Sequence, residues 1–532
     1  MSKSKPRRYP ARAVQDSATP ASVPSLELQR DLVAIGALVL AVAVYRFVVL
    51  AQMPGPPGSD GGNWLAFTFG LFGDSPKAAE STYFPGALVV LKSLMLVLPT
   101  LIALKTMAVL SSVLAAVPLY FLARRACSVG VALFVTTLFL FAGYLSEMMT
   151  WGGYPQLLAT AYMLGALYCL DRWLVEGDRR GLFWGATLVL FVVATHHFTV
   201  VILATVCASY VPFVLYRERA RLGEVTKRLA AFAVAAGALS LLMAPWYLRY
   251  LSLITEDGAL SSSAESLNSF NMVLSYVFAE APLTWIALAA GAFIAGLLPY
   301  ADEDTKRLRP IAFALTLGSA IVYAVTDETR AFQPMQAGIL LSLGIVITAV
   351  MRWLGRLQVA GPVLASGRLT TAAAGLVLML ILVPNGHSRF EGAYDRFGAL
   401  DSDAIEALTW LRDETPEDSV VLPGHRNGWV SYAWWVEGLA QRPAYGLMDP
   451  RFLAFEEEHQ QSALAVRLID EQTTPEETQR LLEETGIAYI FLYKASGGAF
   501  QDLADRVPTT VEFQNDTFVI LRFVTETAGA RP

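Results

Sequence analysis

Residues 32–51 read LVAIGALVLAVAVYRFVVLA, a run that is apolar almost throughout. A helix needs about 20 such residues to cross the hydrocarbon core of a bilayer. Ten further apolar runs follow, near residues 101–123, 128–147, 155–175, 181–197, 198–216, 229–250, 283–300, 310–326, 336–354 and 369–386. The sequence therefore predicts a polytopic α-helical membrane protein with about 11 transmembrane helices.

The overall composition agrees with lipid as the solvent for most of the chain. Of the 532 residues, 55% are hydrophobic and only 16% are charged, whereas soluble chains carry roughly 25% charged residues. Cys127, Cys169 and Cys207 all lie in apolar runs, which is typical of core residues rather than disulfides or metal ligands. The motifs CxxC, HExxH and GxxxxGK(S/T) do not occur, which argues against zinc or nucleoside-triphosphate chemistry.

Basic residues cluster in alternate loops, and this pattern predicts the orientation. The groups are Arg124 with Arg125, Arg179 with Arg180, residues 217–228, residues 306–309, and Arg352, Arg356 and Arg368. Loops rich in Lys and Arg face the cytoplasm. We interpret residues 1–30, which are polar and basic, as a disordered cytoplasmic tail, and residues 31–386 as the transmembrane domain. Eleven spans then place residues 387–532 outside a plasma membrane.

The C-terminal segment 387–532 has a different character from the rest of the chain. Acidic helical stretches at 401–414 and 475–484 alternate with β-type runs at 420–423, 487–493 and 517–523. This alternation predicts an extracytoplasmic α/β domain.

The first outer loop, residues 52–100, is unusually long. It begins GPPGSDGGNW and places Asp60 on a Gly-rich turn. An amphipathic stretch at 64–71, the element Tyr83–Phe84–Pro85–Gly86 and a second apolar run to Pro99 follow. Such a loop has enough apolar surface to lie along the outer leaflet, and long ordered loops are usually functional. Asp60 itself fits two interpretations, a turn residue or a functional carboxylate.

Taken together, the aspartate after the first helix, the long first loop, the aromatic–proline element and the α/β tail resemble the GT-C glycosyltransferases. The resemblance implies an enzyme, a hexosyl- or pentosyltransferase, that takes a sugar from a polyprenyl-phosphate donor. Asp60 would then lie beside the acceptor as general base or as a ligand of Mg²⁺ or Mn²⁺. The sequence leaves open whether the acceptor is a glycan, a lipid or a protein. Nucleic acid is not expected as a partner.

The same resemblance suggests further site residues at outer helix ends. Glu147 corresponds to a second acidic residue, although a solvated helix-end charge explains it as well. Arg330 suits a donor phosphate because guanidinium matches phosphate geometry, and the alternative is an ion pair with Asp327 or Glu328. Arg249 is a second phosphate candidate, which snorkelling to the interface would also explain.

The substrate cavity is expected to include Trp151, Tyr154 and one of two adjacent histidines, His196 and His197. Neighbouring residues on a helix point in different directions, so both histidines are not expected to bind one ion.

One subgroup of the family, the oligosaccharyltransferase catalytic subunit, is disfavoured. Its WWDYG signature follows a strand, whereas residues 424–428 read GHRNG here and Trp434–Trp435 falls further along, on a predicted helix. The aromatic residues of this region are expected to pack on the membrane domain rather than stack on sugar. A lipid-glycan polymerase or ligase, and a non-enzymatic transporter or binding protein, are the alternative functions.

Overall fold

A computed structural model describes residues 26–73 except 57 and 59, 83–141, 148–249, 303–356 except 327, six positions between 384 and 394, 400–446 except 428 and 429, and 456–524 except 471, 496 and 497. The predicted spans at 283–300 and 369–386, and the site candidate Glu147, therefore lie outside the described residues or almost entirely so. So do Asp327 and nearly all of the predicted cytoplasmic tail.

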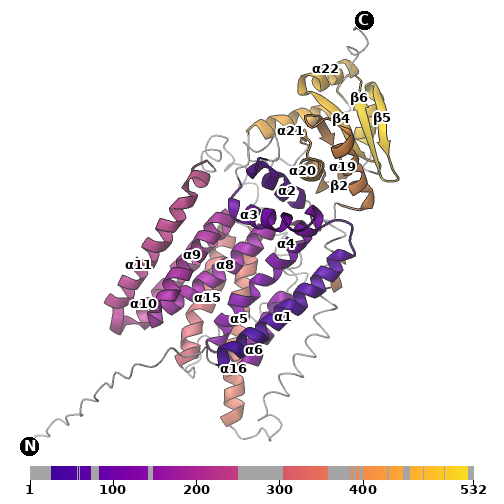
Figure 1. The fold of residues 1–532 in the computed structure, drawn as a ribbon. Coiled ribbons are helices and arrows are strands. Elements are labelled where there is room, and N and C mark those ends of the chain that lie inside the picture. Colours follow the sequence, from indigo (N-terminus) through magenta and orange to yellow (C-terminus); the bar gives the residue numbers. More distant parts are fainter. Residues whose placement is uncertain are drawn as a thin grey trace, which may run out of the picture.

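Every other predicted span coincides with a helix of one bundle (Figure 1). The helices are α1 (Leu26–Ala51), α4 (Thr100–Leu114) with α5 (Ala116–Arg124), α6 (Val129–Leu140), α8 (Tyr154–Asp171), α9 (Arg179–Thr195), α10 (His197–Arg217), α11 (Leu222–Ser240), α15 (Glu303–Thr326) and α16 (Phe332–Arg356). Within the described residues, six helices are long and apolar enough to cross a membrane. The protein is thus a polytopic helical membrane protein, while the total of eleven spans stays a prediction.

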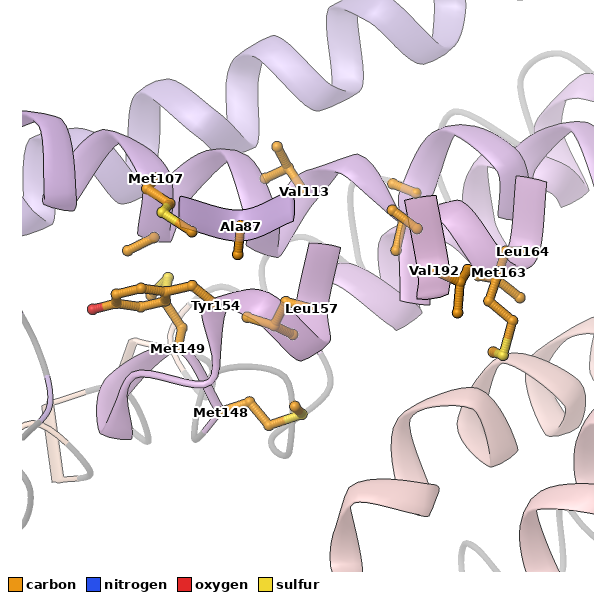
Figure 2. Close-up of a cluster of buried hydrophobic side chains, with 14 of the residues drawn as sticks. Ala87, Met107, Val113, Met148, Met149, Tyr154, Leu157, Met163, Leu164 and Val192 are labelled. Atoms are coloured by element: carbon orange, nitrogen blue, oxygen red, sulfur yellow. The ribbon is translucent and has the colours of Figure 1, made fainter. Parts of the chain in front are cut away.

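Two helix boundaries follow directly from the sequence. The long apolar stretch 181–216 divides at His196, as predicted, because this residue is extended and its ring caps the start of α10. The helix α8 begins at Tyr154 with Pro155 in its first turn, where the missing N–H of proline has no cost. Its buried face packs against α4 and α9. Figure 2 shows part of this core, with Tyr154 among Met107, Met149 and Leu157.

The first loop forms two helices, α2 (Asp60–Leu71) and α3 (Pro85–Met95), at one end of the bundle (Figure 1). We call this end the α2 end. The expectation that Asp60 lies on a turn is wrong, because Asp60 is the first residue of α2. Part of the apolar surface of this loop is covered by protein, since Trp64, Leu65 and Phe69 are buried in the protein core. An apolar helix face can be covered equally well by protein or by lipid.

Residues 400–524 form a four-stranded sheet with the order β1-β4-β6-β5. The strands are β1 (Val420–Pro423), β4 (Ile487–Tyr493), β5 (Thr509–Gln514) and β6 (Phe518–Phe523), beside a small hairpin of β2 (His425–Asn427) and β3 (Val430–Ser431). Strand β1 pairs with β4 in parallel, and the other pairs are antiparallel. The helices are α19 (Ser402–Glu414), α20 (Ala433–Trp435), α21 (Glu456–Ile469), α22 (Pro475–Thr485) and α23 (Gly498–Arg506).

The helical bundle and this α/β unit share one hydrophobic core. A single cluster of buried side chains contains Leu104 of the bundle, Trp64 of α2, and Trp435 and Phe491 of the α/β unit. The π-helical turn Val436–Ala440 follows α20 and packs with it against α2. As the sequence analysis expected of this aromatic region, Trp435 packs against the membrane domain, with no exposed surface.

One charged residue lies within the first predicted span, 32–51. Arg46 of α1 is 6% exposed, and its Nη1 donates to the carbonyl oxygen of Ser112 at 3.1 Å. Its Nη2 donates to the carbonyl oxygen of Leu140, the last residue of α6. The last carbonyls of a helix have no partner within the helix, and a cation is favourable there. Arg46 therefore caps α6 from a neighbouring helix.

Candidate functional site

The start of α2 carries Asp60 and fits tightly against the turn that precedes α8. Gly58 and Gly152 have φ of +94° and +105°, a region that favours glycine. A Cβ added at Gly152 would lie 2.7 Å from the Cβ of Asp60, and one at Gly58 would lie 2.4 Å from the carbonyl carbon of Trp151. The backbone around Gly58 and Asp60 thus lies directly against the backbone of Trp151 and Gly152, although Asp60 and Gly152 are 92 positions apart in the sequence. This contact fixes the position of the half-buried Asp60.

A hydrogen bond holds the same contact from inside α2. Trp64 donates its indole N–H to the carbonyl oxygen of Gly152 at 2.6 Å, and Trp64 is 7% exposed. The ring of Tyr83 lies 4.7 Å from that of Trp64 and stacks on Phe67 at 5.7 Å. The aromatic element before α3 therefore packs against α2.

Tyr154 follows the turn directly and has no exposed surface. It lies within electrostatic range of Asp60. The structure thus brings together two residues that the sequence analysis placed in one site.

Arg330 lies beside Trp151, the residue that precedes Gly152 in this turn. Its guanidinium carbon lies 5.9 Å from the centroid of the Trp151 ring, a cation–π contact. It also forms a loose ion pair with Glu328, at 3.6 Å. The carbonyl oxygen of Arg330 accepts a hydrogen bond from Gln156 Nε2 at 2.7 Å. Because Gln156 belongs to α8, the 3₁₀ turn Thr329–Ala331 is anchored to the helix that begins at the site.

The two histidines do not diverge as predicted. His196 is extended, so only His197 is helical, and the rings stack with centroids 5.3 Å apart. His196 Nδ1 accepts from the backbone N–H of Thr199 at 3.3 Å and caps α10. Both rings lie within electrostatic range of Arg330, and the ring of Phe84 lies 5.7 Å from that of His197. His196 has a structural role, and His197 is the one that is half-exposed beside Arg330.

Arg249 is exposed at the end of the helical segment that continues α11. Two residues earlier, the ring of Tyr247 packs on Phe84 at 4.6 Å, and its hydroxyl donates to the carbonyl oxygen of Val193 at 3.2 Å. Arg249 is therefore more peripheral than Arg330.

Lys105 is a residue whose role the sequence analysis missed. It is 4% exposed, and its Nζ donates to the carbonyl oxygens of Met53 at 2.6 Å and Pro54 at 3.3 Å. Those two residues begin the segment that leads to Asp60. A lone lysine near the start of the apolar run 101–123 was the available signal, but its acceptors lie 52 and 51 positions away.

A metal ion would need several ligands around Asp60. Among the described residues, no group of three His, Cys, Asp or Glu side chains is close enough to hold one. Magnesium often takes only one or two carboxylates and completes its shell with water and substrate phosphate. Within the described part of the chain, Asp60 would have to rely on such a shell.

The sequence matches no protein-family model and no curated protein. Solved structures do resemble the chain. ArnT from Cupriavidus metallidurans bound to undecaprenyl phosphate aligns with a TM-score of 0.55 at 16% identity, over 94% of this chain and 99% of that chain. Its apo state aligns with a TM-score of 0.52 at 15% identity, over 93% and 98%. The mycobacterial arabinofuranosyltransferase AftD aligns with a TM-score of 0.51 at 14% identity, over 91% of this chain and 41% of AftD. The chain therefore shares the fold of ArnT and AftD.

Proposed function

We propose that the protein is a glycosyltransferase that moves a sugar from a polyprenyl-phosphate-linked donor to a hydroxyl group of an acceptor outside the plasma membrane. The observation that carries the proposal is that an acidic residue and a basic residue lie against one turn. Asp60 lies against Gly152, and Arg330 lies over Trp151. An acid–base group and a phosphate-binding cation are the two groups that this reaction needs.

The proposed mechanism uses Asp60 as the general base. Its carboxylate takes the proton of the acceptor hydroxyl, and the hydroxyl oxygen attacks the anomeric carbon of the donor sugar. The bond between that carbon and the donor phosphate oxygen breaks, and the polyprenyl phosphate leaves with the electron pair. Arg330 stabilises the charge that develops on this phosphate, since planar guanidinium pairs well with phosphate oxygens.

The donor class is supported by the ArnT structure, which was solved with undecaprenyl phosphate bound. A long isoprenoid chain would lie in lipid while its phosphate lies at the headgroup level, which is where the ends of transmembrane helices lie. The Asp60–Arg330 site is at such an end, beside α2 (Figure 1). We propose that this end, together with residues 387–532, faces the outside.

A metal-ligand role for Asp60 is the second form of the proposal. Mg²⁺ or Mn²⁺ bound by Asp60 would help to neutralise the donor phosphate. We favour the general-base role because Asp60 can take the acceptor proton without any further ligand, whereas a metal ion would need other groups to complete its shell.

The test is sugar transfer in proteoliposomes from a panel of radiolabelled polyprenyl-phosphate pentoses and hexoses, with candidate lipid, glycan and peptide acceptors. Wild type is compared with Asp60→Asn, and Asp505→Asn, an exposed residue of α23, serves as the control. We expect transfer by wild type and the control and its loss in Asp60→Asn. Sugar transfer that persists in Asp60→Asn would show that Asp60 is not the catalytic base. If the protein binds or transports donors but transfers sugar with no combination of donor and acceptor, the proposed enzymatic function is wrong.

A further inference from the structure

The α/β unit touches the helix that carries Asp60 through its backbone. Gly438 of the π-helical turn lies against Gly62 of α2, and a Cβ added at 438 would lie 2.2 Å from the carbonyl oxygen of Gly62. A Cβ added at Gly62 would in turn lie 2.5 Å from the carbonyl carbon and oxygen of Trp434. Glycines at both positions are what allows the two backbones to approach this closely.

A second contact lies one residue from Asp60. The indole of Trp435 has no exposed surface, and its six-membered ring faces Gly61. A Cβ added at Gly61 would lie 2.9 Å from Cη2 and 3.1 Å from Cζ2 of Trp435, and 3.1 Å from Cδ2 of Leu104. The residue after Asp60 is therefore held between the α/β unit and α4 of the bundle.

From these contacts, and resting on the function proposed above, we infer that Trp435 and Gly438 are positioning residues for Asp60. The α/β unit would then be part of the catalytic machinery, because it contacts the first turn of α2 at Gly61 and Gly62. The Trp151–Gly152 turn contacts the same helix turn at Asp60. A rigid setting matters since a displacement of about 1 Å in a reacting group can lower a rate by about 100-fold.

The two contacts differ in a way that allows a sharp test. The Gly438 contact is with backbone atoms of Gly62, so trimming a side chain cannot relieve an added methyl group there. The Gly61 contact is mainly with the far ring atoms of Trp435, which phenylalanine lacks. We therefore expect the effect of Gly61→Ala, but not that of Gly438→Ala, to be reduced by Trp435→Phe.

The experiment measures kcat and KM for the donor, and hydrogen–deuterium exchange of the α2 amides, in the full-length protein. The variants are Gly438→Ala, Gly61→Ala, Trp435→Phe and the double variant Gly61→Ala/Trp435→Phe. Gly237→Ala on α11 is the steric control, because a Cβ there meets no atom within 4 Å. Leu482→Ala is the stability control, since it empties a position in a separate core cluster of the α/β unit.

We expect Gly438→Ala and Gly61→Ala to lower kcat by about 10-fold to 100-fold with little change in donor KM, and to raise exchange in α2. The double variant should have a higher kcat than Gly61→Ala, which is a non-additivity that general destabilisation does not produce. Leu482→Ala should lower the melting temperature and leave kcat and α2 exchange near wild type.

Three results would overturn the inference. If Asp60→Asn abolishes transfer while Gly438→Ala leaves kcat and α2 exchange unchanged, the proposed function stands and the positioning role does not. If Leu482→Ala lowers kcat as much as Gly438→Ala, the effect is one of stability alone. If wild type transfers no sugar although α2 exchange responds, the proposed function has failed and the role of these residues in positioning a catalytic group falls with it.

Discussion

Trp64 donates its indole N–H to the carbonyl oxygen of Gly152 at 2.6 Å, across 88 positions of sequence. The bond is buried and connects the helix that begins with Asp60 to the turn that precedes α8. It holds the two halves of the proposed site together.

Replacing Trp64 with phenylalanine removes this donor, while the Gly152 carbonyl oxygen still accepts from the backbone N–H of Tyr154 at 2.7 Å. We expect a loss of about 0.5–1.5 kcal/mol in unfolding free energy, together with a lower transfer rate. Thermal unfolding of the purified protein in detergent would measure the first effect. Trp184→Phe, at an exposed tryptophan of α9, is the matched control and should change little. Equal melting temperatures for the two variants would contradict the prediction.

Gly152→Ala tests the contact from the side of the turn. A methyl group at this position would lie 2.7 Å from the Cβ of Asp60, and the φ of +105° is unfavourable for alanine. We expect a fall in kcat that exceeds the fall caused by Trp64→Phe, because both the turn and the first turn of α2 must shift. Gly223→Ala, where a Cβ meets nothing within 4 Å, is the control. A Gly152→Ala enzyme with wild-type kcat would show that the turn does not fix Asp60.

Arg330 is expected to determine donor affinity. Arg330→Gln removes the cation, and Arg330→Lys keeps the charge but loses the planar group that stacks on Trp151 at 5.9 Å. A charge-assisted hydrogen bond contributes about 1.5–3 kcal/mol, so donor KM should rise by about 10-fold to 100-fold in Arg330→Gln. The lysine variant should lie between it and wild type. Arg180→Gln, an exposed residue at the opposite end of α9 from His196, should leave KM unchanged.

The sequence predicts the membrane helices well because hydropathy and length are local properties. The break at His196 could also be predicted, since two histidines interrupt an apolar run whose full length exceeds one span. The strand positions 420–423 and 487–493 follow from short β-type runs between helical stretches and coincide with β1 and β4.

The arrangement of the site is less accessible to sequence reasoning. Residue type and loop position single out Asp60 and Arg330, but their shared turn is formed by contacts across long stretches of chain. The packing of the π-helical turn Val436–Ala440 on α2 could not be predicted from the sequence either. The apolar residues of α2 are compatible with a lipid surface as well as with a protein surface. The stacking of His196 on His197 arises because the helix begins between them, a boundary finer than periodicity defines.

Arg46 is a charged residue in an apolar run, and its hydrogen-bond partners could not be predicted from the hydropathy pattern. Its guanidinium donates to backbone carbonyls of α4 and α6, which lie 66 and 94 positions away. Arg46→Met keeps most of the apolar stem and removes these donors, so we expect a loss of about 2–3 kcal/mol in unfolding free energy. Thermal unfolding and exchange at the C-terminal end of α6 would measure it. Arg30→Met, an exposed residue of the same helix, is the control. Unchanged exchange in α6 would contradict the capping role.

Chelation separates the two roles proposed for Asp60. If Asp60 is a general base, transfer should continue after EDTA treatment and should not respond to added Mg²⁺ or Mn²⁺, because no step then depends on a cation. This is the outcome that we expect from the general-base role. The assay uses the proteoliposomes and donor panel described above, with Asp60→Glu added as a variant. A carboxylate moved by one methylene group should retain some activity as a base.

A loss of transfer in EDTA that Mg²⁺ or Mn²⁺ restores would contradict this expectation and show that a metal ion takes part in transfer. In that case Asp60→Asn should weaken the dependence on metal concentration before it abolishes the rate, because an amide oxygen still coordinates magnesium, although less strongly than a carboxylate. As a base, Asp60→Asn should instead be inactive at every metal concentration, since an amide cannot accept the proton. The metal titration of this one variant therefore decides between the two chemistries.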